Sequence, residues 1–243
     1  MMTRLLLLAI LILGPNMLAQ ALVIGTTAHY PPLASQATRE SFVGFEIDIM
    51  QAICQRIGEA CQFKSLVVST IPEALLTKKI DLAIAGIIPS TPEPGFIFSL
   101  PYLTSETQFI ALKQSSINTP AEIKNKTVGV RRGTIAGGTL FKHFVSNIYN
   151  GNVQIKDFAT LDDLMLGLNN QQIDVAFINS AGAKYWFMNS AGLYKLIGSP
   201  IPIGNGYSIM ANLGQAALIK KINQALLSMI ADGSYLAIYS RYF

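Results

Sequence analysis

The side chains that most often do chemistry in proteins are few in this chain and lie apart. There are two cysteines, Cys54 and Cys61, and two histidines, His29 and His143, which lie in unrelated segments. Two cysteines cannot build a zinc site on their own, and the sequence contains no other spacing that is typical of a metal site. We therefore expect no resident metal and no cofactor.

The two cysteines are predicted to form a structural disulfide. On a continuous helix, residues seven apart are separated by about 10 Å of rise, whereas the Cα atoms of a disulfide lie within about 7 Å of each other. Gly58 stands between the cysteines and can take the left-handed conformation that ends a helix. A chain reversal at Gly58 would bring Cys54 and Cys61 together.

The first 21 residues predict export from the cytoplasm. A basic residue, Arg4, precedes the apolar run 5–13, and the small-residue tripeptide 19–21 follows a Gly-Pro pair. This is the three-part pattern of a secretory signal peptide, and its apolar run is about half the length that spans a membrane. We expect cleavage after Ala21 and a soluble periplasmic product, in a compartment where disulfides persist. The alternative is an uncleaved N-terminal anchor.

The charge of the chain is modest and dispersed. Its 18 basic and 14 acidic residues give a net charge of +4, and the basic residues form no stripe. A solvated surface of mixed charge explains this pattern better than a nucleic-acid interface does. We expect a monomer that binds no nucleic acid. The length that remains after cleavage is enough for a chain that divides into two lobes.

Strand-like and helix-like runs alternate along the chain, which favours parallel sheets covered by helices on both faces. The pattern runs once to about Pro101 and begins again at about Thr107, so two sheets are expected. A breaker-rich connector at 198–206 precedes a last strand and two helices. The predicted strands are 22–25, 80–88, 127–130 and 174–178, and the predicted helices are 46–57, 72–79, 162–168 and 218–230. Glu46 and Asp48 fall in the first turn of a helix and are interpreted as capping groups.

Seven segments in order resemble the family-3 periplasmic solute-binding proteins, which are the receptors of polar amino-acid ABC importers. The segments are 24–32, 42–49, 71–75, 79–86, 98–102, 128–134 and 231–235. The resemblance implies a two-lobed α/β fold of type II, with lobe one at 22–104 plus 203–243 and lobe two at 105–202. It also places the cysteine pair where receptors for basic amino acids carry a disulfide.

The resemblance also implies a set of ligand-binding residues in the cleft between the lobes. Tyr30 matches an aromatic residue that packs against the ligand side chain. Gly86 to Ile88 match a strand end whose backbone receives the amino and carboxylate groups. In lobe two, Thr134 matches a threonine that holds a carboxylate, and Asn179 matches an aspartate that pairs with the ligand ammonium.

This sequence also departs from the family pattern. The family arginine that clamps the ligand carboxylate is replaced by Pro94, and Thr27 stands where an acidic residue often serves basic ligands. Val67 stands near the place of a second aromatic platform. His29, Arg39 and Arg132 are the candidates for replacement charge, and Arg132 is the first choice because it precedes Thr134.

These observations predict a binding protein that captures a small polar, amino-acid-like solute and delivers it to the membrane permease of an ABC importer. A periplasmic dehydratase of the cyclohexadienyl type is the alternative on the same fold, but His29 is the one cleft candidate for acid–base chemistry near neutral pH. A sensor domain is a third hypothesis, which the ending of the chain at Phe243 leaves without an output domain. No enzymatic activity is expected.

Overall fold

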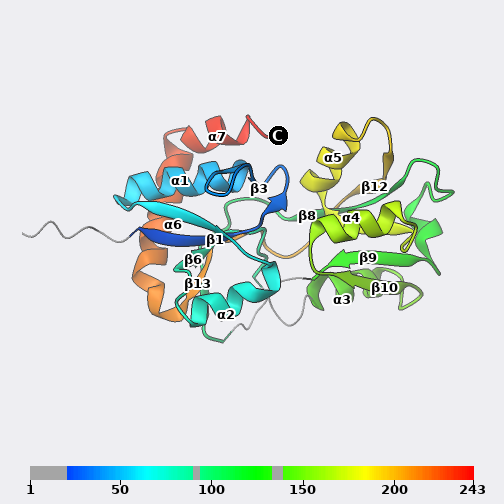
Figure 1. Ribbon diagram of the computed structural model, residues 1–243, viewed down its shortest axis with the longest axis horizontal. Coiled ribbons are helices and arrows are strands. Elements are labelled where there is room, and N and C mark those ends of the chain that lie inside the picture. Colours follow the sequence, from blue (N-terminus) through cyan, green and yellow to red (C-terminus); the bar gives the residue numbers. More distant parts are fainter. Residues whose placement is uncertain (1–20, 90–93, 133–138) are drawn as a thin grey trace, which may run out of the picture.

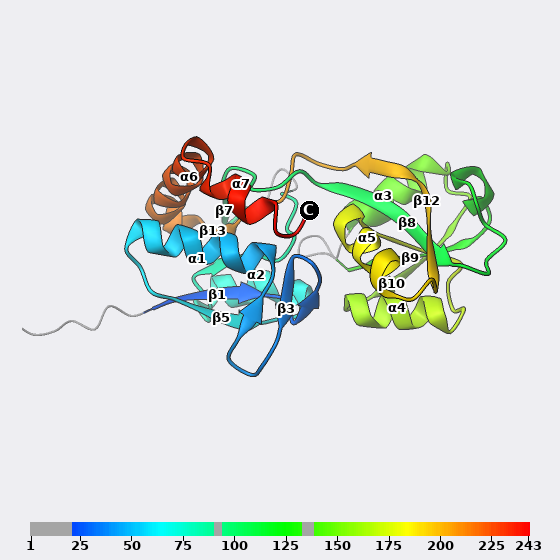
Figure 2. The same ribbon diagram turned by 90° about the horizontal axis from the view of Figure 1, so that it is seen from above.

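The structure, a computed structural model, describes residues 21–89, 94–132 and 139–243. They form two α/β lobes side by side, joined by two chain crossings (Figures 1 and 2). The expected signal peptide lies outside the described residues, apart from Ala21. In the described part of the chain, no helix has the length and apolar character needed to cross a membrane.

The first lobe is built on a five-stranded sheet. Its strands are β1 (Leu22–Thr26), β5 (Cys61–Ser65), β6 (Leu82–Ala83), β7 (Phe96–Phe98) and β13 (Met210–Asn212). Their order is β5-β1-β6-β13-β7. β1 pairs in parallel with β5 and β6, whereas β13 pairs antiparallel with β6 and β7. The chain therefore returns to the first lobe after building the second.

Helices cover both faces of this sheet. Successive side chains of a strand point to opposite faces, so apolar residues of one strand pack against helices on both sides. Leu82 and Ile84 pack into the apolar cluster of α1 and α6, and Ala83 and Ala85 into the cluster of α2. A small sheet, β2-β3-β4, lies on the side that faces the second lobe (Figure 1). These elements are α1 (Phe45–Ile57), α2 (Ile71–Leu76), α6 (Ala216–Ala231), α7 (Ser234–Tyr239), β2 (His29–Tyr30), β3 (Ala34–Gln36) and β4 (Phe42–Val43).

The second lobe repeats this plan. Its strands are β8 (Glu106–Leu112), β9 (Thr127–Arg131), β10 (Gln154–Phe158), β11 (Val175–Asn179) and β12 (Tyr194–Pro202), and its helices are α3 (Thr139–Ile148), α4 (Leu161–Asn169) and α5 (Ser180–Asn189). The sheet order is β10-β9-β11-β8-β12. Val128 and Val130 face the cluster on the α3 side, whereas Ala176 and Ile178 face the α4 side. Among the described residues, 3-10 turns lie at Val68–Thr70, Pro120–Ile123 and Leu213–Gln215.

The two crossings between the lobes are hydrogen-bonded to each other. Leu103 and Tyr207 form an antiparallel bridge, and the Ile203 amide donates to the Ser105 carbonyl at 3.0 Å. The Ser105 hydroxyl donates to the Ile203 carbonyl and accepts from the Gly206 amide. The crossings therefore act as one narrow connection.

The sequence prediction of the elements is confirmed for most of them, and the largest difference is the run 80–88. Only Leu82–Ala83 of that run is a strand. The chain turns at Gly86, whose φ of 62° lies in the left-handed region. A side chain there would also meet the Tyr30 ring at 2.7 Å. Glycine at position 86 thus allows the chain to turn after the strand and lets Tyr30 pack against the backbone.

The predicted disulfide is present. Cys54 lies near the end of α1 and Cys61 begins β5, with their Cα atoms 6.2 Å apart. Gly58 ends α1 with a φ of 74°, the left-handed conformation expected for the reversal.

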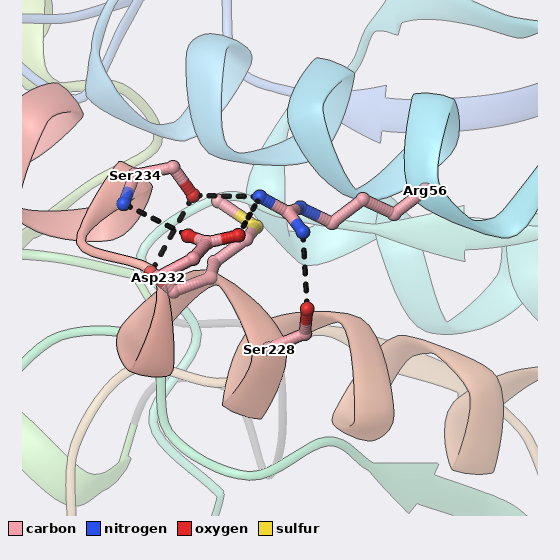
Figure 3. A network of polar contacts seen from close by, with 5 residues as sticks. Arg56, Ser228, Asp232 and Ser234 are labelled. Atoms are coloured by element: carbon pink, nitrogen blue, oxygen red, sulfur yellow. Dashed lines mark hydrogen bonds and ion pairs between the residues drawn. The ribbon is translucent and has the colours of Figure 1, made fainter.

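A polar network fixes the end of α1 against the junction of α6 and α7 (Figure 3). Arg56 donates to Asp232 at 2.7 Å, to Ser228 at 3.0 Å and to Ser234 at 2.8 Å. Hydrogen bonds from Ser234 and the charge of Arg56 lower the pKa of Asp232 to about 2. The C-terminal helices are thereby tied to the helix that carries Cys54.

Replacing both Cys54 and Cys61 by alanine should lower the free energy of unfolding by about 2.5 kcal/mol, because the bridge closes a loop of about eight residues in the unfolded chain. Urea denaturation of the oxidised protein and of the double variant measures the difference. Reducing agent should destabilise the parent protein and leave the variant unchanged. Two free thiols in the native protein, detected by mass spectrometry without reductant, would contradict the bridge.

Candidate functional site

The candidate site lies where strands of both lobes end and the lobes meet. β1 and β6 of lobe one and β9 and β11 of lobe two run in parallel within their sheets. The carboxyl ends of such strands are where open α/β sheets bind ligands. Residues from these ends and from β2 meet in the cleft.

A buried contact across the cleft joins Arg131 and Tyr30. Arg131 is the last residue of β9, and its Cζ atom lies 4.0 Å from the centre of the Tyr30 ring. Both side chains are buried, with exposed fractions of 7% and 3%. Burial raises the pKa of Tyr30, and the charge of Arg131 opposes that shift. A cation of lobe two therefore rests on an aromatic ring of lobe one.

Two further polar side chains adjoin the Tyr30 hydroxyl, Asn179 from lobe two and Tyr207 from the second crossing. The Asn179 Oδ1 atom caps α5 by accepting from the Gly182 amide. Its Nδ2 atom and the Tyr207 hydroxyl lack a hydrogen bond of normal geometry in the described structure, although both are buried. Unpaired donors therefore gather around Tyr30.

Glu46 is the buried carboxylate of this region. Its Oε1 atom accepts hydrogen bonds from the Gly86 amide at 2.7 Å and from the Tyr102 hydroxyl at 2.6 Å, while Oε2 has no partner among the described residues. Burial raises the pKa of Glu46 to about 7, and the two hydrogen bonds and the charge of Arg131 oppose that shift. Glu46 holds the turn at Gly86, so its role is not restricted to capping its own helix.

A cavity of about 210 Å³ opens beside Arg131. Side chains of both lobes line it, including Thr27, Val67 and Thr160. At its edge the Nδ1 atom of His29 pairs with the Oδ1 atom of Asp162 across the cleft. The cavity thus combines hydroxyl groups, a guanidinium and a histidine–aspartate contact. No group of three or more histidine, cysteine, aspartate or glutamate side chains in the described ranges is placed to hold a metal ion.

The structure brings some of the predicted site residues together and separates others. Thr27 lines the cavity beside Arg131. The Gly86 amide is directed to Glu46. Ile88 packs toward Gly204 of the second crossing.

Arg132, the first choice for replacement charge, is exposed, and its amide donates to the Phe158 carbonyl. Thr134 lies outside the described residues. Arg39 is exposed in the turn between β3 and β4, and Pro94 is exposed as well.

Sequence reasoning missed Arg131 in favour of its neighbour. The signal was the alternation of side chains along β9. Val128 and Val130 belong to the core on the α3 side, so Arg131 must project on the other face of the sheet. An arginine at the carboxyl end of a buried parallel strand points into the cleft. Tyr207 carried no such pattern because it lies in the irregular connector.

The model of one protein family matches almost the whole described chain. The family is described as bacterial extracellular solute-binding proteins, family 3, and the match covers residues 22–243.

Individual proteins that this chain resembles are also periplasmic binding proteins. The chain is 28% identical to the arginine-binding periplasmic protein of Mannheimia haemolytica over 96% of this chain and 95% of the relative. It is similar to the crystal structure of an arginine 3rd transport system periplasmic binding protein from Legionella pneumophila, with a TM-score of 0.85, 40% identity, and coverage of 92% and 99% of the two chains. An ancestral arginine-binding protein bound to arginine gives a TM-score of 0.80 at 30% identity, over 92% and 98%.

Replacing Glu46 by glutamine should remove a pH dependence of stability. Because the folded pKa of about 7 exceeds the ordinary value of 4.5, the folded protein keeps the proton that the unfolded chain loses. The parent protein should therefore lose about 3 kcal/mol of stability as the pH rises from 4.5 to above 7. The Glu46→Gln variant should not show this loss, since its amide oxygen can still accept from Gly86 and Tyr102.

Urea denaturation at several pH values between about 4 and 8 measures the free energy of unfolding of both proteins. Glu73→Gln is the matched control, because Glu73 is an exposed carboxylate and its replacement should leave the pH profile unchanged. Parallel profiles for the parent and Glu46→Gln proteins would contradict the raised pKa.

Proposed function

Because the chain belongs to family 3 of the bacterial extracellular solute-binding proteins, we propose that it captures an amino acid or a related small polar solute and delivers it to the membrane permease of an ABC importer. The main support for this function is that buried polar groups of both lobes converge in the cleft, namely Tyr30, Arg131 and Asn179. Such a constellation can grip one small polar molecule from two sides.

Residues 22–104 with 203–243 move as one body and residues 105–202 as the other, about the paired crossings. A ligand that contacts both bodies favours the closed arrangement by the free energy of those contacts. We assign ligand contact to Thr27, Tyr30, Thr134 and Asn179, together with backbone groups near Gly86 and Ile88.

The relatives bear names of arginine- and histidine-binding proteins, which supports an amino-acid-like ligand for this chain. They are binding proteins of transport systems, so the dehydratase alternative has no support among them. We infer that the protein works as a monomer without cofactor or catalytic activity.

A periplasmic location is supported by these relatives, several of which are periplasmic proteins. We infer that the N-terminal segment directs export and is removed after Ala21.

A cognate ligand should stabilise the protein and make it more compact. At a ligand concentration 100 times the dissociation constant, binding adds about 2.7 kcal/mol to the free energy of unfolding. A thermal-shift screen of the common L-amino acids should find the ligand, and small-angle scattering should then show a smaller radius of gyration at saturation. Bound ligand without compaction would contradict closure.

The mature protein should begin at Leu22. N-terminal sequencing of periplasmic material from cells that express the full chain tests the cleavage site. A protein that begins at Met1 would contradict it and favour the N-terminal anchor.

A further inference from the structure

Arg131 is a buried cation with no polar partner among the residues that the structure describes. Within the described residues its guanidinium makes neither a hydrogen bond nor an ion pair, and its contact is with the face of the Tyr30 ring. A buried charge costs several kcal/mol unless it is paired, and a guanidinium has five N–H donors to satisfy. The position of Arg131 at the edge of a cavity leaves room for a partner from outside the chain.

Buried donors beside Tyr30 also lack an acceptor of normal geometry in the described part of the chain. The Asn179 Nδ2 atom is a donor, because Oδ1 of the same amide is used in capping α5. Among the described residues, the buried hydroxyl groups of Thr27 and Tyr207 have no hydrogen bond of normal geometry either. Glu46 accepts from Gly86 and Tyr102 through Oε1, its Oε2 atom has no partner among the described residues, and no ion pair joins it to Arg131. The guanidinium of Arg131 and the Asn179 amide nitrogen can only donate, so acceptor oxygens of a ligand suit this part of the site.

The position of the Arg131 guanidinium also disfavours a positive charge on the ligand side chain. It lies on the face of Tyr30, the aromatic residue that we assign to ligand contact. Two like charges at about 4 Å repel by about 4 kcal/mol at the effective dielectric constant of a protein surface. Thr27 carries no negative charge that would neutralise a second cation at that position, and the carboxylate of Asp162 in the same cavity is paired with His29.

We propose, on the basis of the function proposed above, that Arg131 binds a carboxylate of the ligand from lobe two and thereby selects amino acids with acidic or neutral side chains against basic ones. Arg131 thus supplies the charge missing at Pro94, but from the opposite lobe. Its planar, bidentate geometry suits a carboxylate better than an ammonium group would.

Isothermal titration of the mature protein against the common L-amino acids tests the selection. L-arginine and L-lysine should bind at least about tenfold more weakly than the best acidic or neutral amino acid. Replacing Arg131 by methionine should weaken that best ligand about 10- to 100-fold, which corresponds to a charged hydrogen bond. The same substitution should also reduce the ratio between the affinity for that ligand and the affinity for L-arginine.

L-glutamate and L-glutamine identify the carboxylate that Arg131 binds. A loss for both in Arg131→Met assigns Arg131 to the α-carboxylate, and a loss for L-glutamate alone assigns it to the side-chain carboxylate. Arg131→Lys keeps the charge without the bidentate geometry, so it should keep the preference against basic ligands at reduced affinity. This variant decides the question if Arg131→Met does not fold.

Arg132→Met is the matched control, because Arg132 is the exposed neighbour of Arg131 and its replacement should leave the affinities within about twofold. Tightest binding of L-arginine or L-lysine by the parent protein would overturn the selection and leave the proposed function intact. Unchanged preferences in Arg131→Met would also overturn it. If no amino acid binds, the selection is wrong and the proposed function is reduced to capture of another small polar solute.

Discussion

The pairing of the two crossings is the constraint on which the rest of the molecule depends. Ser105 bonds to both Ile203 and Gly206, and Leu103 bridges Tyr207, so the two chains between the lobes run as one antiparallel connection. Two strands that are hydrogen-bonded to each other can bend or twist together, but they do not slide apart without losing those bonds. The lobes can therefore change their mutual angle while the strand ends that face the cleft stay in register.

The interface between the lobes suits a protein that must open again. Its centre is polar, with the buried groups of Tyr30, Arg131 and Asn179 in place of interlocking aliphatic side chains. Burial of unpaired donors costs free energy, so closure without a ligand gains little. A molecule that pairs with those donors repays the desolvation and shifts the balance toward the closed form. The same groups thus contribute to ligand affinity and make the closed form without ligand only weakly favourable.

Periodic features of the sequence predicted much of the fold, and single side-chain directions were harder to obtain. Helices and strands such as 162–168 and 127–130 have clear apolar spacing, and Gly58 marked the reversal that allows the disulfide. The run 80–88 was predicted too long because hydrophobicity alone does not show that Gly86 adopts a positive φ under Tyr30. Glu46 was assigned to capping because its partners, Gly86 and Tyr102, are distant in sequence. Arg131 was predictable from alternation, whereas its contact with Tyr30 depends on how the lobes meet.

The lobe from which a charge contacts the ligand determines when that contact forms. An arginine on the lobe that first receives the ligand would contribute to affinity in the open state as well as in the closed one. Arg131 reaches Tyr30 only when the lobes are together, so a bond from Arg131 to a ligand held on lobe one belongs to the closed state alone. A contact of that kind adds its whole free energy to the difference between the two states, and it is this difference that sets the closed population. A ligand carboxylate bound by Arg131 of lobe two is therefore coupled more strongly to closure than one bound by an arginine at position 94 of lobe one.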